Sequence, residues 1–134
     1  MNRNELTGTT LSFLGDAVYS LKVREYYLLN GFRKANMLQQ LCTNYVSAKG
    51  QTKVYERMIR DNFLNEEELE VFKRGRNGIG HIPKNGDLRT YTIASGIEAI
   101  VGYLYLEDKV RLEEFFNKAF EGGIDNEWIY LGSQ

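Results

Sequence analysis

The segment that most constrains the fold is residues 11–21, LSFLGDAVYSL, which has the pattern of a helix that is apolar almost all the way round. Its apolar positions are Leu11, Phe13, Leu14, Ala17, Val18, Tyr19 and Leu21. A helix without a continuous polar face is typical of a buried helix. Asp16 interrupts this one directly after Gly15. Because a buried carboxylate is unfavourable without a partner, we expect a cation or a strong hydrogen-bond donor to face Asp16.

A second apolar segment, residues 93–106 with the sequence IASGIEAIVGYLYL, has the same arrangement. Glu98 is its only charged residue. Gly102 is a poor helix former, so its presence in a helix indicates a close approach of another helix. If the two apolar helices cross near Gly15 and Gly102, the carboxylates of Asp16 and Glu98 face one cation.

The residues around these two acids favour a hard metal ion. Oxygen ligands without a nearby histidine or cysteine favour Mg²⁺ or Mn²⁺ over zinc. Ser12 and Ser95 precede the acids by four and three residues, so each acid shares its helix face with a hydroxyl. The residues alone leave an alternative open, in which Asp16 binds a buried arginine or a backbone donor and Glu98 pairs with a lysine or arginine.

The composition restricts the classes of protein to consider. A chain of 134 residues without a Ser-, Gly- or Pro-rich linker is expected to form one domain over residues 1–134. A single cysteine, Cys42, excludes a disulfide framework and a cysteine-rich zinc site. No apolar run reaches the length of a membrane span, and the first residues lack the apolar region of a signal peptide. We therefore expect a cytoplasmic protein that does not bind membranes.

The remaining patterns predict helices and no strands, and hence an all-α bundle with a core over about residues 8–121. Helices are expected at about 9–30, 35–61 with a break near 47–50, 65–74, 87–106 and 110–121. The glycine-rich segment 75–87, GRNGIGHIPKNGD, is expected to form a functional loop. For residues 122–134 the sequence leaves open whether the tail packs on the body or is disordered.

Positive charge is concentrated in one part of a chain whose formal net charge is −1. Between Lys73 and Arg89 there are five lysines and arginines and one acid, Asp87. A local basic segment on a nearly neutral protein can form a patch that binds phosphates. An ordinary solvated loop is the alternative for any one of these residues.

Several motifs together resemble the ribonuclease III family. Residues 14–18, LGDAV, are similar to its first acidic motif, and Glu98-Ala99 with Gly102 to its second. The chain most resembles the Mini-ribonuclease III branch, which has a catalytic domain and no double-stranded-RNA-binding domain. Residues 45–49 (YVSAK) and 74–77 (RGRN), and Pro83-Lys84-Asn85 with Asp87, are similar to segments of that branch in the same order, so the resemblance covers roughly residues 8–120.

The resemblance implies an activity and a site. It implies an all-helical homodimer that hydrolyses double-stranded RNA to 5′-phosphate and 3′-hydroxyl ends, and the branch is associated with trimming precursor 23S ribosomal RNA. Asp16 and Glu98 match the catalytic carboxylates that hold Mg²⁺, for which Mn²⁺ is a substitute. Longer members carry two further acids, whose positions fall on Ser12 and Ser95 here. These hydroxyls are expected to reach the metal only through water.

The expected RNA-binding residues lie in two groups. Arg74, Arg76 and Lys84 are expected to contact phosphates, while Asn77 and Asn85 either bind 2′-hydroxyls or form turns. In the second group, Ser47, Lys49 and Gln51 either steer RNA or form a helix junction. A non-catalytic RNA-binding or ribosome-associated module is the alternative function, because Ser12 and Ser95 replace two acids. Whether a ribosomal protein helps to present the RNA stays open.

Overall fold

The computed structural model describes residues 5–78 and 87–123, and this part of the chain is almost entirely helical and contains no strand. The all-α fold class is therefore confirmed. The helices within these ranges are α1 (Gly8–Leu29), α2 (Ala35–Val46), α3 (Ala48–Arg60), α4 (Glu66–Asn77), α5 (Leu88–Glu107) and α6 (Lys109–Ala119). None of them is long and apolar enough to cross a membrane.

Side-chain caps determine where these helices begin. The Ser47 hydroxyl accepts a hydrogen bond from the Gly50 amide and separates α2 from α3, as the predicted break requires. Asn65 and Glu68 form a capping box at the start of α4. Unlike the prediction, α4 continues through Gly75 to Asn77, because Gly75 lies on its packed face rather than beyond its end. Arg74, Arg76 and Asn77 therefore belong to the last turn of α4 and not to a loop.

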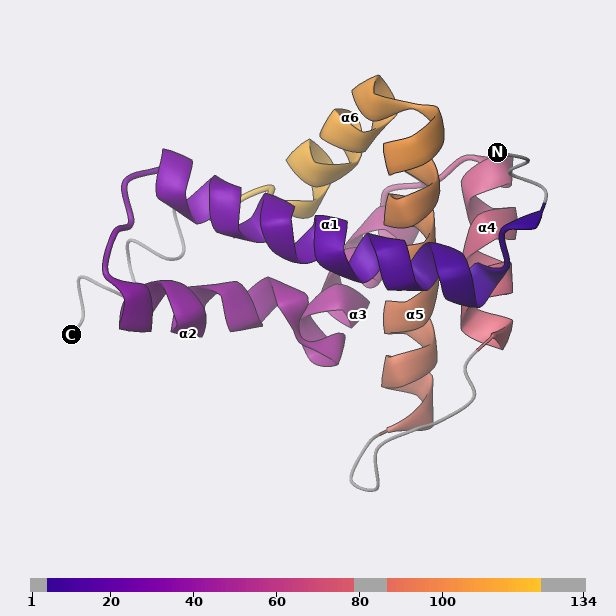
Figure 1. Cartoon of the computed structure of the whole chain (residues 1–134), viewed down its shortest axis with the longest axis horizontal. Coiled ribbons are helices and arrows are strands. Elements are labelled where there is room, and N and C mark those ends of the chain that lie inside the picture. Colours follow the sequence, from indigo (N-terminus) through magenta and orange to yellow (C-terminus); the bar gives the residue numbers. More distant parts are fainter. Residues whose placement is uncertain (1–4, 79–86, 124–134) are drawn as a thin grey trace.

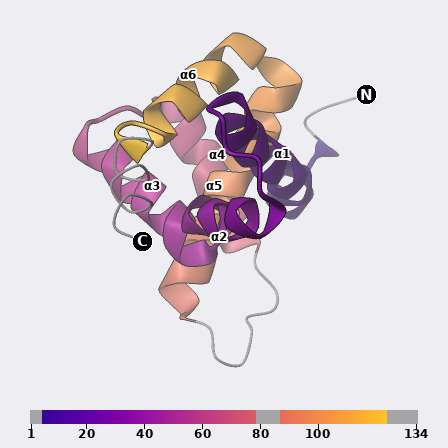
Figure 2. The same ribbon diagram turned by 90° about the vertical axis from the view of Figure 1, so that its left-hand side faces the viewer.

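Helix α5 is the centre of the bundle. Figures 1 and 2 show it surrounded by other helices, and it packs against α1, α3, α4 and α6. Ile97, Ala99, Ile100 and Val101 of α5 are completely buried. Burial on every side explains why this segment is apolar almost throughout.

Two glycines bring α1 directly onto the backbone of α5. A Cβ atom added at Gly15 would overlap the carbonyl oxygen of Glu98, and one added at Gly102 would overlap the carbonyl oxygen of Leu11. The predicted crossing near Gly15 and Gly102 is therefore confirmed. No side chain separates the two backbones at this point, so residues beside the glycines are brought close together.

One face of α1 is apolar and exposed. Leu11 and Val18 are buried as predicted, and Val23 is buried as well, but Phe13 is 82% exposed and Leu21 is 53% exposed. The expectation that α1 is buried on all sides is therefore wrong for a single copy of the protein. Its core-facing side packs on α2, α4 and α5, whereas the Phe13 side chain is exposed.

Candidate active site

The α1–α5 crossing brings the carboxyl groups of Asp16 and Glu98 together. Asp16 follows Gly15, and Gly15 packs on the backbone of Glu98 itself. The two side chains are hydrogen-bonding partners. Glu98 is half-buried, whereas Asp16 is exposed at the edge of the crossing. The expectation that Asp16 is buried is therefore wrong, although the expected approach of the two acids is found.

The surroundings of Glu98 favour its protonated form. Burial of Glu98, followed by its hydrogen bond to Asp16 and the negative charge there, raises the pKa of Glu98 from 4.5 to about 9. Without a metal, these surroundings favour a state in which the two acids hold one proton between them. A shared proton between two acids indicates a site where a cation would remove charge repulsion.

Within the described residues, no protein cation pairs with these two acids. Across residues 5–78 and 87–123, neither Asp16 nor Glu98 forms an ion pair with a lysine or arginine. The alternative in which an arginine neutralises one of them is therefore not found in this part of the chain. Nor does the same part hold any group of three His, Cys, Asp or Glu residues that would bind a metal. Two carboxylates suit Mg²⁺, which keeps several waters and typically uses one or two protein carboxylates with substrate phosphates.

Ser12 and Ser95 form a hydrogen-bonded link beside the acids. The Ser12 hydroxyl donates to the Ser95 carbonyl oxygen at 2.7 Å, and the two hydroxyl oxygens are 3.2 Å apart. The Ser95 hydroxyl in turn donates to the Gly75 carbonyl oxygen at 2.9 Å. These bonds connect α1, α5 and α4 one helical turn from the two acids. Each serine therefore has a structural role whether or not it also holds water near a metal.

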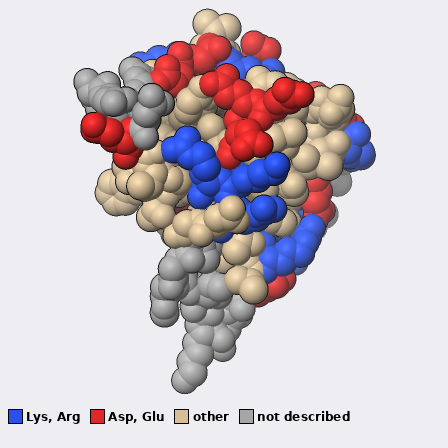
Figure 3. All heavy atoms as spheres, turned by 90° about the vertical axis from the view of Figure 1, so that its right-hand side faces the viewer, with Lys and Arg blue, Asp and Glu red and all other residues tan. Residues whose placement is uncertain are grey.

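The expected basic residues lie at the C-terminal end of α4. Figure 3 shows Lys and Arg side chains gathered on this side of the molecule, below a group of acids. The acids of α4 are in its first turn, and Arg74 and Arg76 are in its last. Arg74 donates to the Leu6 carbonyl oxygen, and the Arg76 guanidinium lies 6.0 Å from the centre of the Phe72 ring. Asn77 is exposed beside them, while Lys84 and Asn85 lie outside the described residues.

The three residues of the second expected RNA-binding group differ in their exposure and contacts. Lys49 is exposed, and Ser47 uses its hydroxyl to cap α3. Gln51 is only 3% exposed, and its side-chain amide donates to the Val46 carbonyl oxygen. Of the two alternatives for Gln51, these contacts favour the helix junction, because its position on α3 points the side chain into the α2–α3 junction.

Two cationic residues near Lys49 were not selected from the sequence. Lys53 and Arg57 follow Lys49 at intervals of four residues on α3, so all three share one helix face. This spacing is visible in the sequence and is the signal that would have identified them. They line a cavity together with residues of α2 and the end of α6.

The raised pKa of Glu98 predicts how stability depends on pH. Without divalent ions, the free energy of unfolding should fall as the pH rises from 4.5 to about 9, because the folded protein holds the Glu98 proton more tightly than the unfolded chain does. This stabilising contribution is complete below pH 4.5 and is lost as the pH passes about 9. Urea denaturation across this range should show a smaller loss in Glu98→Gln, which cannot ionise.

Glu25→Gln is the matched control, since Glu25 is an exposed glutamate on α1. It should keep the pH dependence of the unchanged protein. The same pH dependence in Glu98→Gln as in the unchanged protein would contradict the shared-proton description of the site.

Comparison with known proteins agrees with this arrangement. A family model for the Ribonuclease III domain matches residues 9–109. The Mini-ribonuclease 3 of Enterococcus faecalis is 43% identical over 115 residues, which cover 84% of this chain and 87% of that protein. The one from Streptococcus pneumoniae is 44% identical over 112 residues, covering 82% and 88%.

A solved structure gives the same result for the fold. The crystal structure of a Fusobacterium nucleatum protein matches with a TM-score of 0.77 and 33% sequence identity, over 88% of this chain and 96% of that one. The family match extends over both acidic segments, with Asp16 and Glu98 inside it. This chain therefore belongs to the ribonuclease III family, within which it is an endoribonuclease similar to the Mini-ribonucleases 3.

Proposed function

We propose that this endoribonuclease hydrolyses phosphodiester bonds of double-stranded RNA at the Asp16–Glu98 pair and leaves 5′-phosphate and 3′-hydroxyl ends. The observation that carries the proposal is the approach of two carboxyl groups, from distant parts of the sequence, without a protein cation between them among the described residues. Two acids that share a proton are poor partners for RNA phosphates by themselves. Their arrangement is explained when a divalent cation lies between them and the substrate.

Mg²⁺ is the proposed cation, with Mn²⁺ as a substitute, and Asp16 and Glu98 are its protein ligands. Such an ion activates the attacking water and stabilises the departing oxygen of a phosphodiester. Asp16, which is exposed, is placed to face the substrate, while Glu98 lies deeper and is fixed by the packing of α5. Ser12 and Ser95, which hold the helices together, are proposed to bind water near the ion rather than the ion itself.

RNA contacts are proposed for the end of α4 and the segment that follows it. Arg74 and Arg76 supply positive charge for phosphates, and Asn77 supplies an amide for a 2′-hydroxyl. Lys84 and Asn85 are proposed to act in the same way. Phosphates and 2′-hydroxyls are the groups that proteins contact when they recognise double-stranded RNA by shape.

Precursor 23S ribosomal RNA is the proposed substrate, and the cytoplasm the proposed compartment. Support for the RNA comes from the similarity to Mini-ribonucleases 3 over most of the chain. A ribosomal protein that presents this RNA is a further proposed partner. The test is incubation of the purified protein with precursor 23S RNA, and with an unrelated duplex, in Mg²⁺ or in a chelator.

Cleavage of the precursor at defined positions in Mg²⁺, and none in the chelator, is the expected result. RNA binding without any metal-dependent cut would instead favour the non-catalytic module. Equal cleavage of both RNAs would support the nuclease and contradict the choice of substrate.

A homodimer is the proposed assembly, formed through the exposed apolar face of α1 within the Phe13–Tyr27 region. Phe13 and Leu21 in this region are 82% and 53% exposed, and Leu28, which directly follows it, is 44% exposed. Several large exposed apolar residues on one side of a helix in a small protein are typical of a protein–protein interface. Two copies related by a twofold axis would cover the same face on each other.

Phe13→Asp is expected to convert the dimer into a monomer. A charge at the centre of an apolar interface loses the burial of the aromatic ring, and it adds the desolvation of a carboxylate. Sedimentation velocity at several protein concentrations measures the change. Val110→Asp is the control because Val110 is an exposed apolar residue of α6. A monomer in the unchanged protein, or an undisturbed dimer in Phe13→Asp, would contradict the proposed interface.

A further inference from the structure

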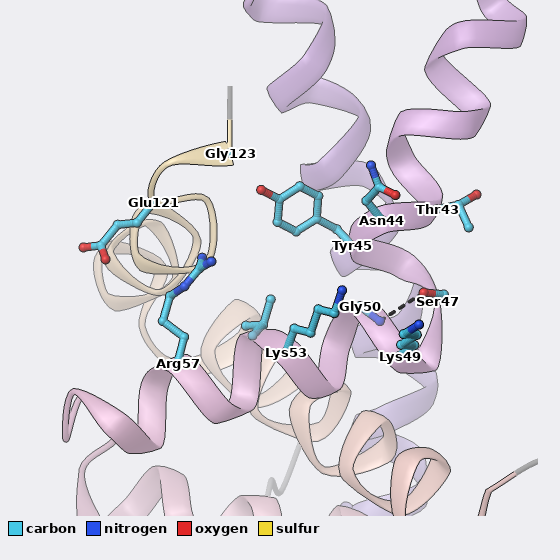
Figure 4. A pocket seen from close by; sticks show the side chains of 11 residues that line it. Thr43, Asn44, Tyr45, Ser47, Lys49, Gly50, Lys53, Arg57, Glu121 and Gly123 are labelled. Carbon is cyan, nitrogen blue, oxygen red and sulfur yellow. Dashed lines mark hydrogen bonds between the residues drawn. The ribbon is translucent and has the colours of Figure 1, made fainter. Parts of the chain in front are cut away.

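A polar cavity lies between the end of α2, the face of α3 and the end of α6. Its volume is about 410 Å³, and Figure 4 shows the residues that line it. None of them belongs to the Asp16–Glu98 pair or to the end of α4. The lining residues are Thr43, Asn44, Tyr45, Ser47, Lys49, Gly50, Lys53, Val54, Arg57, Glu121 and Gly123.

Three cations of α3 line this cavity from one side. Lys49, Lys53 and Arg57 are spaced by four residues, so they form a row along one face of the helix. Each is four residues, or about 6 Å of rise along the helix, from the next. In Figure 4, Lys53 and Arg57 point from α3 toward the space below Tyr45 and Gly123.

The charges of this row are not neutralised within the described part of the chain. Over residues 5–78 and 87–123, neither Lys49 nor Lys53 has an ion-pair partner. Glu121, the only acid of the lining, is paired with Lys118 at 3.1 Å, and its carboxylate points away from the cavity in Figure 4. The cavity therefore has an excess of positive charge.

The backbone around the row is fixed by packing. Gly50 lets the first turn of α3 lie directly against the end of α2, because a Cβ atom there would overlap the carbonyl oxygen of Asn44. Arg57 is half-buried, and its guanidinium donates to the Ala119 carbonyl oxygen at 2.7 Å, which holds α3 against α6. The concave shape thus follows from helix contacts, while Lys49 and Lys53 stay exposed at its edge.

We propose that this cavity is a second phosphate-binding site, which takes backbone phosphates of the RNA duplex away from the bond that is cut. The proposal rests on the proposed function for its choice of ligand. A row of cations beside hydroxyl and amide groups is the chemistry that binds phosphates. Two exposed lysines one turn apart suit consecutive phosphates of an extended polyanion, because each can contact one phosphate without entering a closed cavity.

The double variant Lys49→Gln with Lys53→Gln tests this site. Fluorescence anisotropy in a chelator, where no cleavage occurs, measures its affinity for a duplex RNA. This affinity is expected to fall about tenfold. The plot of log affinity against log salt concentration should become less steep by the amount that corresponds to about two lost phosphate contacts. In Mg²⁺, KM for the same duplex should rise while kcat at saturating RNA is unchanged, because the lysines position the RNA and do not touch the reacting atoms.

The matched control is Lys34→Gln with Lys109→Gln, which removes the same charge from exposed positions just before α2 and at the start of α6. An equal loss of affinity in the control would overturn the proposal, since the effect would then be one of net charge. Unchanged affinity and salt dependence in the Lys49/Lys53 variant would also overturn it, even if inorganic pyrophosphate binds in the cavity. The binding measurements need no catalysis, so they remain decisive if the nuclease proposal itself fails.

Discussion

Asp16→Asn and Glu98→Gln are each expected to reduce the rate of RNA cleavage by about a thousandfold or more. A metal ion in such a site would activate water and stabilise the leaving group, so the loss of one of its ligands should cost several kcal/mol of transition-state stabilisation. Each 1.36 kcal/mol of this loss lowers the rate by a factor of ten. Single-turnover cleavage of a labelled duplex in Mg²⁺ measures the rate. In the metal-free state both variants should stay folded, because each amide has nearly the size and shape of the carboxyl group that it replaces.

Glu67→Gln provides the control for this experiment, because Glu67 is an exposed acid of α4 that accepts a hydrogen bond from Tyr103. Its cleavage rate should stay close to that of the unchanged protein. If Asp16→Asn or Glu98→Gln keeps full activity while folded, that residue has no part in the reaction.

Gly15→Ala is expected to destabilise the protein by about 3 kcal/mol or more, the upper end of the cost of overpacking. Helix propensity alone predicts the opposite sign, a gain of about 1 kcal/mol for alanine over glycine inside a helix. The packing should prevail because the added methyl group would overlap the Glu98 carbonyl oxygen, and backbone atoms of a central helix cannot move aside as a side chain can. Urea denaturation gives the sign and size of the change.

Ala17→Gly, on the exposed side of the same helix, isolates the propensity effect and should lower stability by about 1 kcal/mol. Cleavage by Gly15→Ala should also fall, since a displaced α1 moves Asp16 away from Glu98. A variant Gly15→Ala that is more stable than the unchanged protein would show that the two backbones are not in contact.

Local signals in the sequence were sufficient for most helix boundaries. Ser47 separates two helices because its hydroxyl caps the second one, and Asn65 caps α4 together with Glu68. The glycines of the apolar helices were informative as well, because a glycine that lowers helix propensity needs a packing reason. From Gly15 and Gly102 the α1–α5 crossing could be predicted, and with it the approach of the two acids.

The errors concern which side of a helix other elements cover. Helix α1 is apolar on nearly all sides, so its sequence does not show which side packs on α5 and which side stays exposed. For this reason the sequence predicts a buried Asp16, whereas Asp16 is exposed. For Gln51 the sequence leaves open an RNA contact or a helix junction, and the packing of α2 on α3, which encloses Gln51, favours the junction. The cavity beside Lys53 depends on the end of α6, far along the chain, and no local pattern contains that information.

The link between Ser12 and Ser95 has a consequence for how this domain can change. Each hydroxyl gives its proton to a main-chain oxygen of a neighbouring helix, and an ionised carboxylate has no proton to give. Acids introduced at both positions would remove both of these hydrogen bonds between helices and would place four acidic side chains within one turn of each other. An acid-rich version of this centre would therefore require α1, α4 and α5 to be joined by different contacts, so the number of acids and the packing of the three helices can change only together.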